Sequence, residues 1–252
     1  YCETRLENRS SFHRLRVIFQ SNLSSEKTWA DSPFDIIERP AAPPEEWKGA
    51  SQQSPLHSFC TVESEEQQGL ALFSKGLHEY RLTNTETGTL ALTLLRCVGH
   101  ISRGGEASFS FETPEAQCLG IHRFEYALHP YHGQGYRDLL PRLAEAYSRP
   151  VATHQFEPQK GKLSRKQPLL SVEPECVLPS AVKMCEERGT VMIRLVNPSR
   201  EEVQAAIKTG PSLKDVHILD MLENRQKKVT SKRTGVEIPM KPGQILTLEL
   251  VF

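Results

Sequence analysis

The stretch from Thr113 to Pro130, TPEAQCLGIHRFEYALHP, follows the run TLLRCVGHISR at Thr93 to Arg103. Gly120 to His129 and Thr89 to Val98 are apolar or alternating runs of strand length, and turn-forming residues bound them. This pattern favours β-strands over helices. The two runs contain neither a metal-ligand array nor a nucleophile with its base, so they predict antiparallel β structure without naming a reaction.

The same pattern extends through the first 130 residues. We expect further strands at Arg14–Gln20, Phe34–Arg39, Leu56–Val62, Leu70–Lys75, Glu79–Asn84 and Glu106–Glu112. Gly69, Gly76 and Gly88 separate several of them, and glycine permits the tight reversals between antiparallel neighbours. One short helix is expected at 136–147, where Leu140 and Ala144 share a face at a spacing of four residues.

A polar, basic segment, Val151 to Gln167, follows the expected helix and predicts a linker. We therefore expect two domains, residues 1–165 and residues 166–252. Strands of a compact antiparallel sandwich are predicted in the second domain at Leu169–Val172, Val177–Lys183, Thr190–Val196, Val203–Lys208, Val216–Asp220, Lys228–Ser231 and Ile245–Val251. The fold class expected from the residues is all-β.

Composition narrows the classes of partner. Lys plus Arg and Asp plus Glu both number 31 in 252 residues, so no net field favours nucleic acid or an anionic membrane. No apolar run approaches the roughly 20 residues of a membrane helix. The chain starts at Tyr1 and its first methionine is Met184, which indicates a fragment. A soluble protein with a neutral partner is expected.

The six cysteines form no Cys-x-x-Cys pair, so free thiols in a reducing, cytoplasmic compartment are expected. Cys118, His122, His129 and His132 are the one cluster that resembles a metal site. Alternation along a strand points His122 and His129 to opposite faces, which argues against convergence on zinc. Nothing in the sequence places two carboxylates opposite each other as a catalytic pair.

Seven segments in the first 130 residues resemble, in the same order, the C-terminal β region of glycoside hydrolase family 38, the α-mannosidases. They are HRLRV (13–17), ADSPFD (30–35), ERP (38–40), GLALFSKGLHEY (69–80), LTLLR (92–96), TPEAQCLG (113–120) and HRFEYAL (122–128). The resemblance is greatest to bacterial members and covers nearly all of residues 1–130. The remainder is similar only in its sandwich-like pattern.

The resemblance implies a retaining, exo-acting α-mannosidase. In this family, zinc and an aspartate nucleophile lie in an N-terminal β/α domain, which a helical bundle and the β region follow. No stretch here resembles the first two parts. The resemblance thus implies an antiparallel supersandwich portion over residues 1–165, a smaller sandwich over 166–252, no cofactor in this fragment, and no activity of the fragment alone.

The implied partners are the protein's own N-terminal catalytic and helical domains and a mannoside substrate at a shared pocket. Further copies of the chain are a third possible partner, in a homo-oligomer. Residues that could reach the rim of that pocket are Asp31, Asp35, Tyr80, Arg96 and Arg103. A guanidinium could bind sugar hydroxyls or the carboxylate of an aglycone such as glycerate. Structural salt bridges are the alternative for the two arginines, and capping of the Ser32–Pro33 turn for the two aspartates. No catalytic or metal-binding residue is assigned.

Two other functions remain open at this level. A β-sandwich can act as a stand-alone carbohydrate-binding module, or as a non-catalytic interaction module of immunoglobulin-like type, and fold alone does not decide between them. Binding of mannosides to the isolated chain would favour the first of these.

Overall fold

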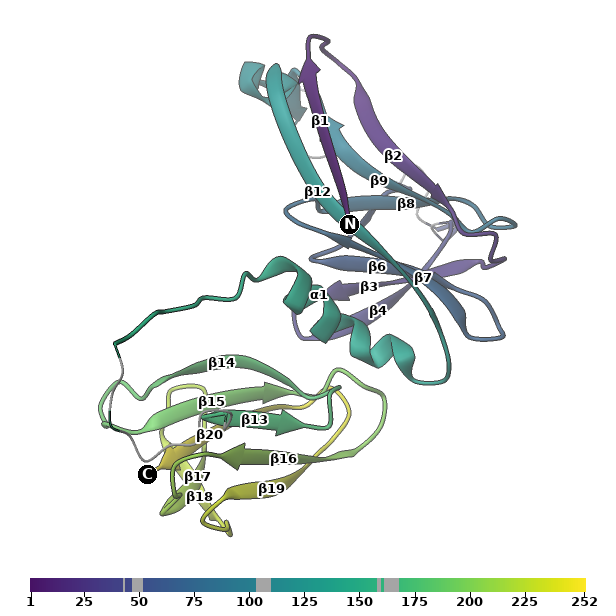
Figure 1. The fold of residues 1–252 in the computed structure, drawn as a ribbon. Coiled ribbons are helices and arrows are strands. Elements are labelled where there is room, and N and C mark those ends of the chain that lie inside the picture. Colours follow the sequence, from purple (N-terminus) through teal and green to yellow (C-terminus); the bar gives the residue numbers. More distant parts are fainter. Residues whose placement is uncertain (43, 47–51, 103–109, 158–159, 161–167) are drawn as a thin grey trace. The chain divides into compact units, whose positions relative to one another are not determined.

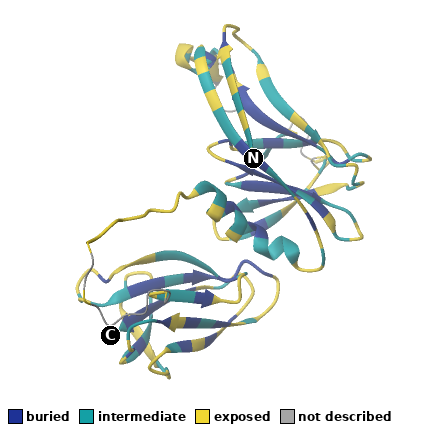
Figure 2. Cartoon of the chain, viewed as in Figure 1, coloured by how far each residue is buried: buried dark blue, intermediate teal, exposed yellow. Residues whose placement is uncertain are grey.

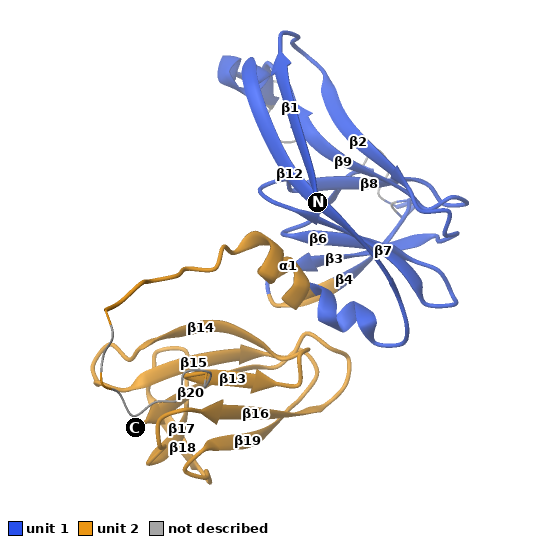
Figure 3. Ribbon diagram, in the orientation of Figure 1, with its two compact units in different colours: residues 1–33, 37–140 blue, residues 34–36, 141–252 orange. Residues whose placement is uncertain are grey.

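The computed structural model describes residues 1–42, 44–46, 52–102, 110–157, 160 and 168–252. The chain forms two compact units (Figure 3): unit 1 contains residues 1–33 and 37–140, and unit 2 contains residues 34–36 and 141–252. Each unit contains antiparallel sheets, and the described part contains one α-helix, so the all-β prediction is confirmed. The predicted boundary between residues 165 and 166 stays a prediction.

Unit 1 contains two large sheets (Figure 1). The six-stranded sheet has the order β1 (Cys2–Asn8), β12 (Gly120–His132), β7 (Gln68–Ser74), β6 (Phe59–Glu63), β3 (Lys27–Ser32) and β4 (Asp35–Pro40). The four-stranded sheet has the order β2 (Arg14–Gln20), β9 (Thr89–Arg96), β8 (Glu79–Asn84) and β5 (Ser54–Pro55). A small hairpin joins β10 (His100–Ser102) to β11 (Ser110–Glu112).

The core of unit 1 draws side chains from both large sheets. Leu72 and Tyr126 come from the six-stranded sheet, whereas Leu90, Leu92 and Leu94 come from alternate positions of β9. β7, which supplies Leu72, and β9 are largely dark blue in Figure 2. Alternation along β9 therefore places one set of its side chains in the core and leaves the other set on the outer face of the four-stranded sheet.

Two helical segments follow β12: the 3-10 helix η2 (Tyr136–Leu139) and the α-helix α1 (Leu140–Ser148). Gly135 precedes them with φ of 74°, a conformation that suits glycine. Pro141 is the second residue of α1, where its missing N–H removes no intrahelical hydrogen bond. Leu140 and Ala144 are buried, so the predicted helix forms with the predicted face inward.

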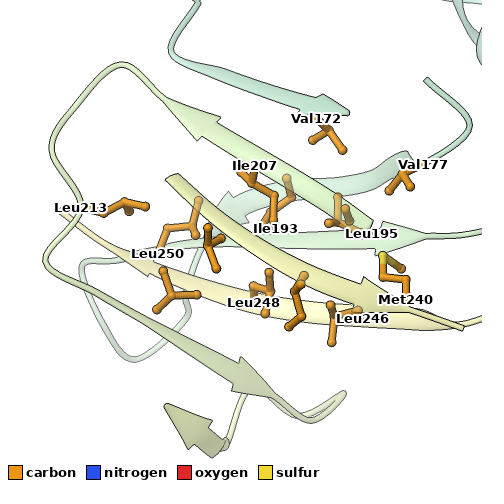
Figure 4. Packing of buried hydrophobic residues seen from close by; sticks show 14 residues of the cluster. Val172, Val177, Ile193, Leu195, Ile207, Leu213, Met240, Leu246, Leu248 and Leu250 are labelled. Carbon is orange, nitrogen blue, oxygen red and sulfur yellow. The ribbon is translucent and has the colours of Figure 1, made fainter. Parts of the chain in front are cut away.

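Unit 2 is a smaller sandwich of two sheets. The five-stranded sheet has the order β14 (Leu178–Met184), β15 (Val191–Val196), β20 (Ile245–Val251), β17 (Asp215–Leu219) and β18 (Arg225–Val229). The three-stranded sheet has the order β13 (Leu170–Glu173), β16 (Val203–Thr209) and β19 (Gly235–Met240). Ile193, Leu195, Ile207, Met240 and Leu248 pack in its core (Figure 4).

The outer face of the five-stranded sheet in unit 2 contains a buried carboxylate. Glu249 accepts hydrogen bonds from Arg225 Nε at 2.6 Å, from Arg188 Nε at 3.0 Å and from Thr190 Oγ1 at 2.6 Å. Its side chain is 0% exposed. The hydrogen bonds from Arg225, reinforced by those from Thr190 and Arg188, hold the pKa of Glu249 at about 2. This carboxylate is therefore ionised and fully engaged within unit 2.

β3 and β19 are among the strands that the sequence did not predict. In β3 the buried residues Thr28, Trp29 and Ala30 are consecutive, so the strand shows no alternation. In β19 the alternation of Val236, Ile238 and Met240 is present, but Gly235 and Pro239 obscure it. Pro239 is tolerated because β19 is the edge strand of its sheet.

Candidate functional site: a basic depression in unit 1

A shallow depression of about 490 Å³ lies where β2 begins and β9 ends. The residues that line it are Phe12, His13, Arg14, Arg96, Cys97, Val98, Gly99 and His100. Two of these side chains are guanidinium groups and two are imidazoles, and no carboxylate is among the described residues of the lining. We refer to this site as the basic depression.

A β-bulge places Arg96 in the basic depression. Simple alternation along β9 would turn Arg96 toward the core with Leu92 and Leu94. The register shifts between Leu15 and Arg16 of β2, so that Leu15 pairs with Leu95 and Arg14 pairs with Arg96. Directly paired residues project from the same face. The extra residue of β9 thus moves Arg96 to the exposed face beside Arg14.

Hydrogen bonds hold the wall of the depression in place. Phe12 has φ of 55°, and its backbone N–H donates to Gln117 Oε1 at 2.8 Å. Buried Asn8 donates from Nδ2 to the carbonyl oxygens of Gln117 and Cys118, at 3.0 and 2.8 Å. A Cβ at Gly99 would lie 2.6 Å from Phe12 Cε1, so glycine is needed for the ring to pack there.

Cationic groups outnumber carboxylates on this face of the four-stranded sheet. Glu79 Oε1 accepts from Thr93 Oγ1 at 2.7 Å and lies 3.2 Å from Arg14 Nε. Arg16 and Arg81 each have a buried Nε without a hydrogen-bond partner in the described part of the chain. Burial is the main cause that lowers the pKa of Arg16, and the positive charges of Arg14 and Arg81 add to it.

Arg96 lies at the end of this row of charges. It is exposed, and no ion pair involves it among the residues that the structure describes. It therefore keeps its full set of donors for an external group.

The thiol in the depression is not activated as a nucleophile. Cys97 Sγ lies 3.9 Å from His13 Nε2, and Asn8 Nδ2 lies 3.5 Å from the same sulfur. Burial, followed by the neighbouring Cys118, raises the pKa of Cys97. A raised pKa lowers the thiolate fraction, so this geometry favours a structural thiol. No disulfide joins any two of the six cysteines, all of which lie in the described part of the chain.

The aspartates that were predicted to reach a substrate pocket bind backbone N–H groups. The Asp31 carboxylate accepts backbone N–H groups of His57, Ser58 and Phe59 at 2.9 to 3.0 Å, which fixes the start of β6. Asp35 Oδ1 accepts the Ile36 N–H at 2.7 Å.

Tyr80 is 1% exposed, and its hydroxyl lies 2.8 Å from Thr28 Oγ1 within unit 1. Burial raises its pKa. Arg103 lies outside the described residues. Of the predicted set, only Arg96 lines the basic depression, and the substrate contacts of the whole set stay predictions.

The histidines of β12 are engaged separately. His122 Nε2 lies 2.7 Å from the Cys118 carbonyl oxygen, and His129 Nε2 lies 2.9 Å from the Tyr136 hydroxyl. Within the described ranges, no three His, Cys, Asp or Glu side chains converge to hold a metal ion. No chemical step is therefore assigned to a metal at these histidines.

Sequence reasoning named Arg96 but missed the companions that complete the site. Arg14 belongs to the segment HRLRV that carries the family resemblance, but its pairing with Arg96 depends on a bulge that has no sequence signature. Phe12 and Gly99 contribute through backbone geometry and close packing. No helix in the described part of the chain has the length and hydropathy to cross a bilayer.

The fold defines the class as an all-β protein of two antiparallel units in tandem, the second a compact sandwich. Comparison with known protein families identifies the family to which these two units correspond. Residues 2–100 match the glycosyl hydrolases family 38 C-terminal domain, and residues 177–248 match the family 38 C-terminal beta sandwich domain. The chain belongs to glycosyl hydrolase family 38 and represents its C-terminal region, as the sequence resemblance predicted.

Individual relatives agree with this assignment. The chain is 30% identical to a protein of Halalkalibacterium halodurans named "Putative mannosylglycerate hydrolase", over 96% of this chain and 26% of that protein. It is 26% identical to an alpha-mannosidase from Enterococcus faecalis V583, with a TM-score of 0.82 over 98% of this chain and 27% of that one. A family 38 protein from Enterococcus faecalis gives a TM-score of 0.80 at 25% identity. The chain spans about a quarter of the length of these relatives.

Proposed function

We propose that this chain is the structural and pocket-completing C-terminal region of a retaining exo-α-mannosidase, which hydrolyses terminal α-mannosides. The observation that carries the proposal is the match of both family 38 C-terminal domains, in order, together with the similarity of 98% of the chain to an alpha-mannosidase. The name of the Halalkalibacterium relative points to a mannoside with a glycerate aglycone as the first substrate to test.

The proposal divides the enzyme into two parts. Zinc and the aspartate nucleophile belong to N-terminal catalytic and helical domains, which would be the partners of this chain, and the chain alone would be inactive. The proposed setting is cytoplasmic, with self-association as a further property. Support for the chain's ancillary role comes from its charged groups: the one fully buried carboxylate among the described residues, Glu249, is held by two arginines rather than poised for catalysis.

Arg96 is the residue through which the chain would reach the substrate. It is exposed, the bulge directs it outward, and its donors are free of ion pairs with described residues. A guanidinium in this state can bind sugar hydroxyls or a carboxylate. Among the predicted residues, it is the one whose position in the structure best supports a contact with an external group.

The test uses the full-length enzyme. We expect Arg96→Ala to lower kcat/KM for mannosylglycerate about 10-fold or more, the size expected when a hydrogen bond to a charged group is lost, without a change in thermal midpoint. Arg233→Ala is the matched control, because Arg233 is an exposed arginine of unit 2. Unchanged kinetics for Arg96→Ala would remove this residue from the pocket. Lack of mannosidase activity in the full-length enzyme would overturn the proposal.

The alternative of a stand-alone carbohydrate-binding module is tested on the 252-residue chain. A scaffold should give no heat of binding with methyl α-mannoside, whereas saturable binding by calorimetry would favour the module.

A further inference from the structure

The composition of the basic depression identifies the chemistry of a ligand. Arginine has only hydrogen-bond donors, and Arg14 and Arg96 are cross-strand partners on one face. His13 and His100 line the same depression, and His13 Nδ1 is buried without a hydrogen-bond partner in the described part of the chain. A sugar ring presents both donors and acceptors, whereas this lining is richest in donors. It suits a group that only accepts and carries negative charge.

The charged residues next to the basic depression also favour an anionic ligand. Glu79 is the carboxylate that faces Arg14, and it already accepts a hydrogen bond from Thr93. Arg16 and Arg81 lie close enough to interact electrostatically, Arg16 also interacts with Glu79, and neither arginine forms an ion pair within 4 Å in the described part of the chain. Glu112 pairs across the hairpin with His100 but does not line the depression. The face thus carries an excess of positive charge, which raises the local concentration of anions.

The site is also preorganised. The hydrogen bonds from Asn8 to the turn at Gln117, and from Phe12 to the Gln117 side chain, fix the wall before any ligand arrives. The bulge fixes the direction of Arg96 through the backbone. Preorganised donors lose less entropy on binding than flexible ones.

We propose that the basic depression binds a small oxyanion, a carboxylate or a phosphate, between Arg14 and Arg96. Both groups present oxygen pairs that match the fork of a guanidinium. The inference rests on the proposed function only for the choice of glycerate as one probe. The site itself requires no hydrolysis and is tested on the 252-residue chain.

The chain is titrated separately with sodium glycerate and with sodium phosphate, in a low-salt buffer, and binding is followed by NMR amide shifts and by calorimetry. We expect saturable binding of at least one anion, with shifts at residues 12–14 and 96–100. Arg96→Gln should weaken binding about 10-fold or more. Arg96→Lys should retain part of the affinity, Arg14→Gln should also weaken it, and Arg233→Gln should leave it unchanged.

The two probes separate the sources of the ligand. Binding of glycerate but not phosphate assigns a carboxylate, and the reverse assigns a phosphate group. Absence of binding by both anions, or binding that Arg96→Gln does not change while thermal melting shows an intact fold, overturns the proposal. Oxyanion binding by the chain, combined with unchanged hydrolysis by the full-length Arg96→Ala enzyme, would contradict the pocket role and leave the anion site standing.

Discussion

In unit 2, one carboxylate on the outer face of a sheet is enclosed by two arginines, whereas in unit 1 four arginines share a sheet face with one glutamate among the described residues. Glu249 is 0% exposed and accepts bonds from Arg188 and Arg225. Glu79 is 27% exposed, and Arg96 at the end of its face has no ion pair with described residues. Both units are antiparallel sandwiches with leucine-rich cores. The same architecture therefore supports a closed charge network that stabilises and an open one that can bind.

The largest expected effect is at the closed network. Glu249→Ala should destabilise unit 2 by about 3–5 kcal/mol, because it leaves two arginines without their buried partner. Chemical denaturation followed by fluorescence and circular dichroism measures this loss. Glu79→Ala should cost less, about 1 kcal/mol, because Glu79 is partly hydrated. Equal losses at the two positions would remove the distinction between the two faces.

Acid should act on the closed network next. The folded pKa of Glu249 is about 2 and its ordinary value is 4.5. Because the pKa of Glu249 is lower in the folded state than in the unfolded state, its ionised carboxylate stabilises the folded state fully at pH values above about 4.5. This stabilisation is lost as the pH falls from about 4.5 toward 2. The difference between the two pKa values corresponds to about 3 kcal/mol of folding stability. In urea denaturation at pH 7, 4 and 3, Glu249→Gln should be less stable than the parent chain at pH 7 and should lose less stability as pH falls. Parallel pH profiles would contradict this role.

A substitution at Asp31 tests whether a hydrogen-bonded carboxylate also stabilises unit 1. Its bonds to three consecutive backbone N–H groups predict that Asp31→Asn destabilises unit 1 by about 1–3 kcal/mol. Glu86→Gln is the control, because Glu86 is an exposed residue in the β8–β9 turn. Thermal denaturation gives the comparison. No shift for Asp31→Asn would leave its carboxylate available for the pocket role predicted from sequence.

The smallest expected effect is at Tyr80. Tyr80→Phe keeps the ring in the core and removes the hydroxyl that bonds Thr28, so a loss of about 1 kcal/mol is expected in thermal denaturation. In the full-length enzyme, this variant should leave KM unchanged if the hydroxyl acts only within the core. A large rise in KM without loss of stability would instead support the substrate contact.

Alternation predicted most of the strands because a half-buried strand exposes every second residue. β2 and β20 form over the predicted residues, and β9 extends over most of its predicted run. The pattern could not predict β3, whose buried residues are consecutive, or the side of β9 from which Arg96 projects. The latter depends on one unpaired residue, and bulges follow from tertiary pairing. The basic depression was therefore invisible in the sequence, although Arg96 itself was named.

The bulge between β2 and β9 has a consequence for how this enzyme family can diverge. Thr93 and Arg96 project from the same face although two residues lie between them, so removing Leu94 or Leu95 would restore simple alternation and leave Arg96 opposite Arg14. A relative one residue shorter at this position would therefore keep the arginine pair, whereas a strand of the same length without the bulge would turn the arginine toward the core. Comparisons among relatives should align this region by strand pairing, since a one-residue gap here is compatible with the same arginine pair.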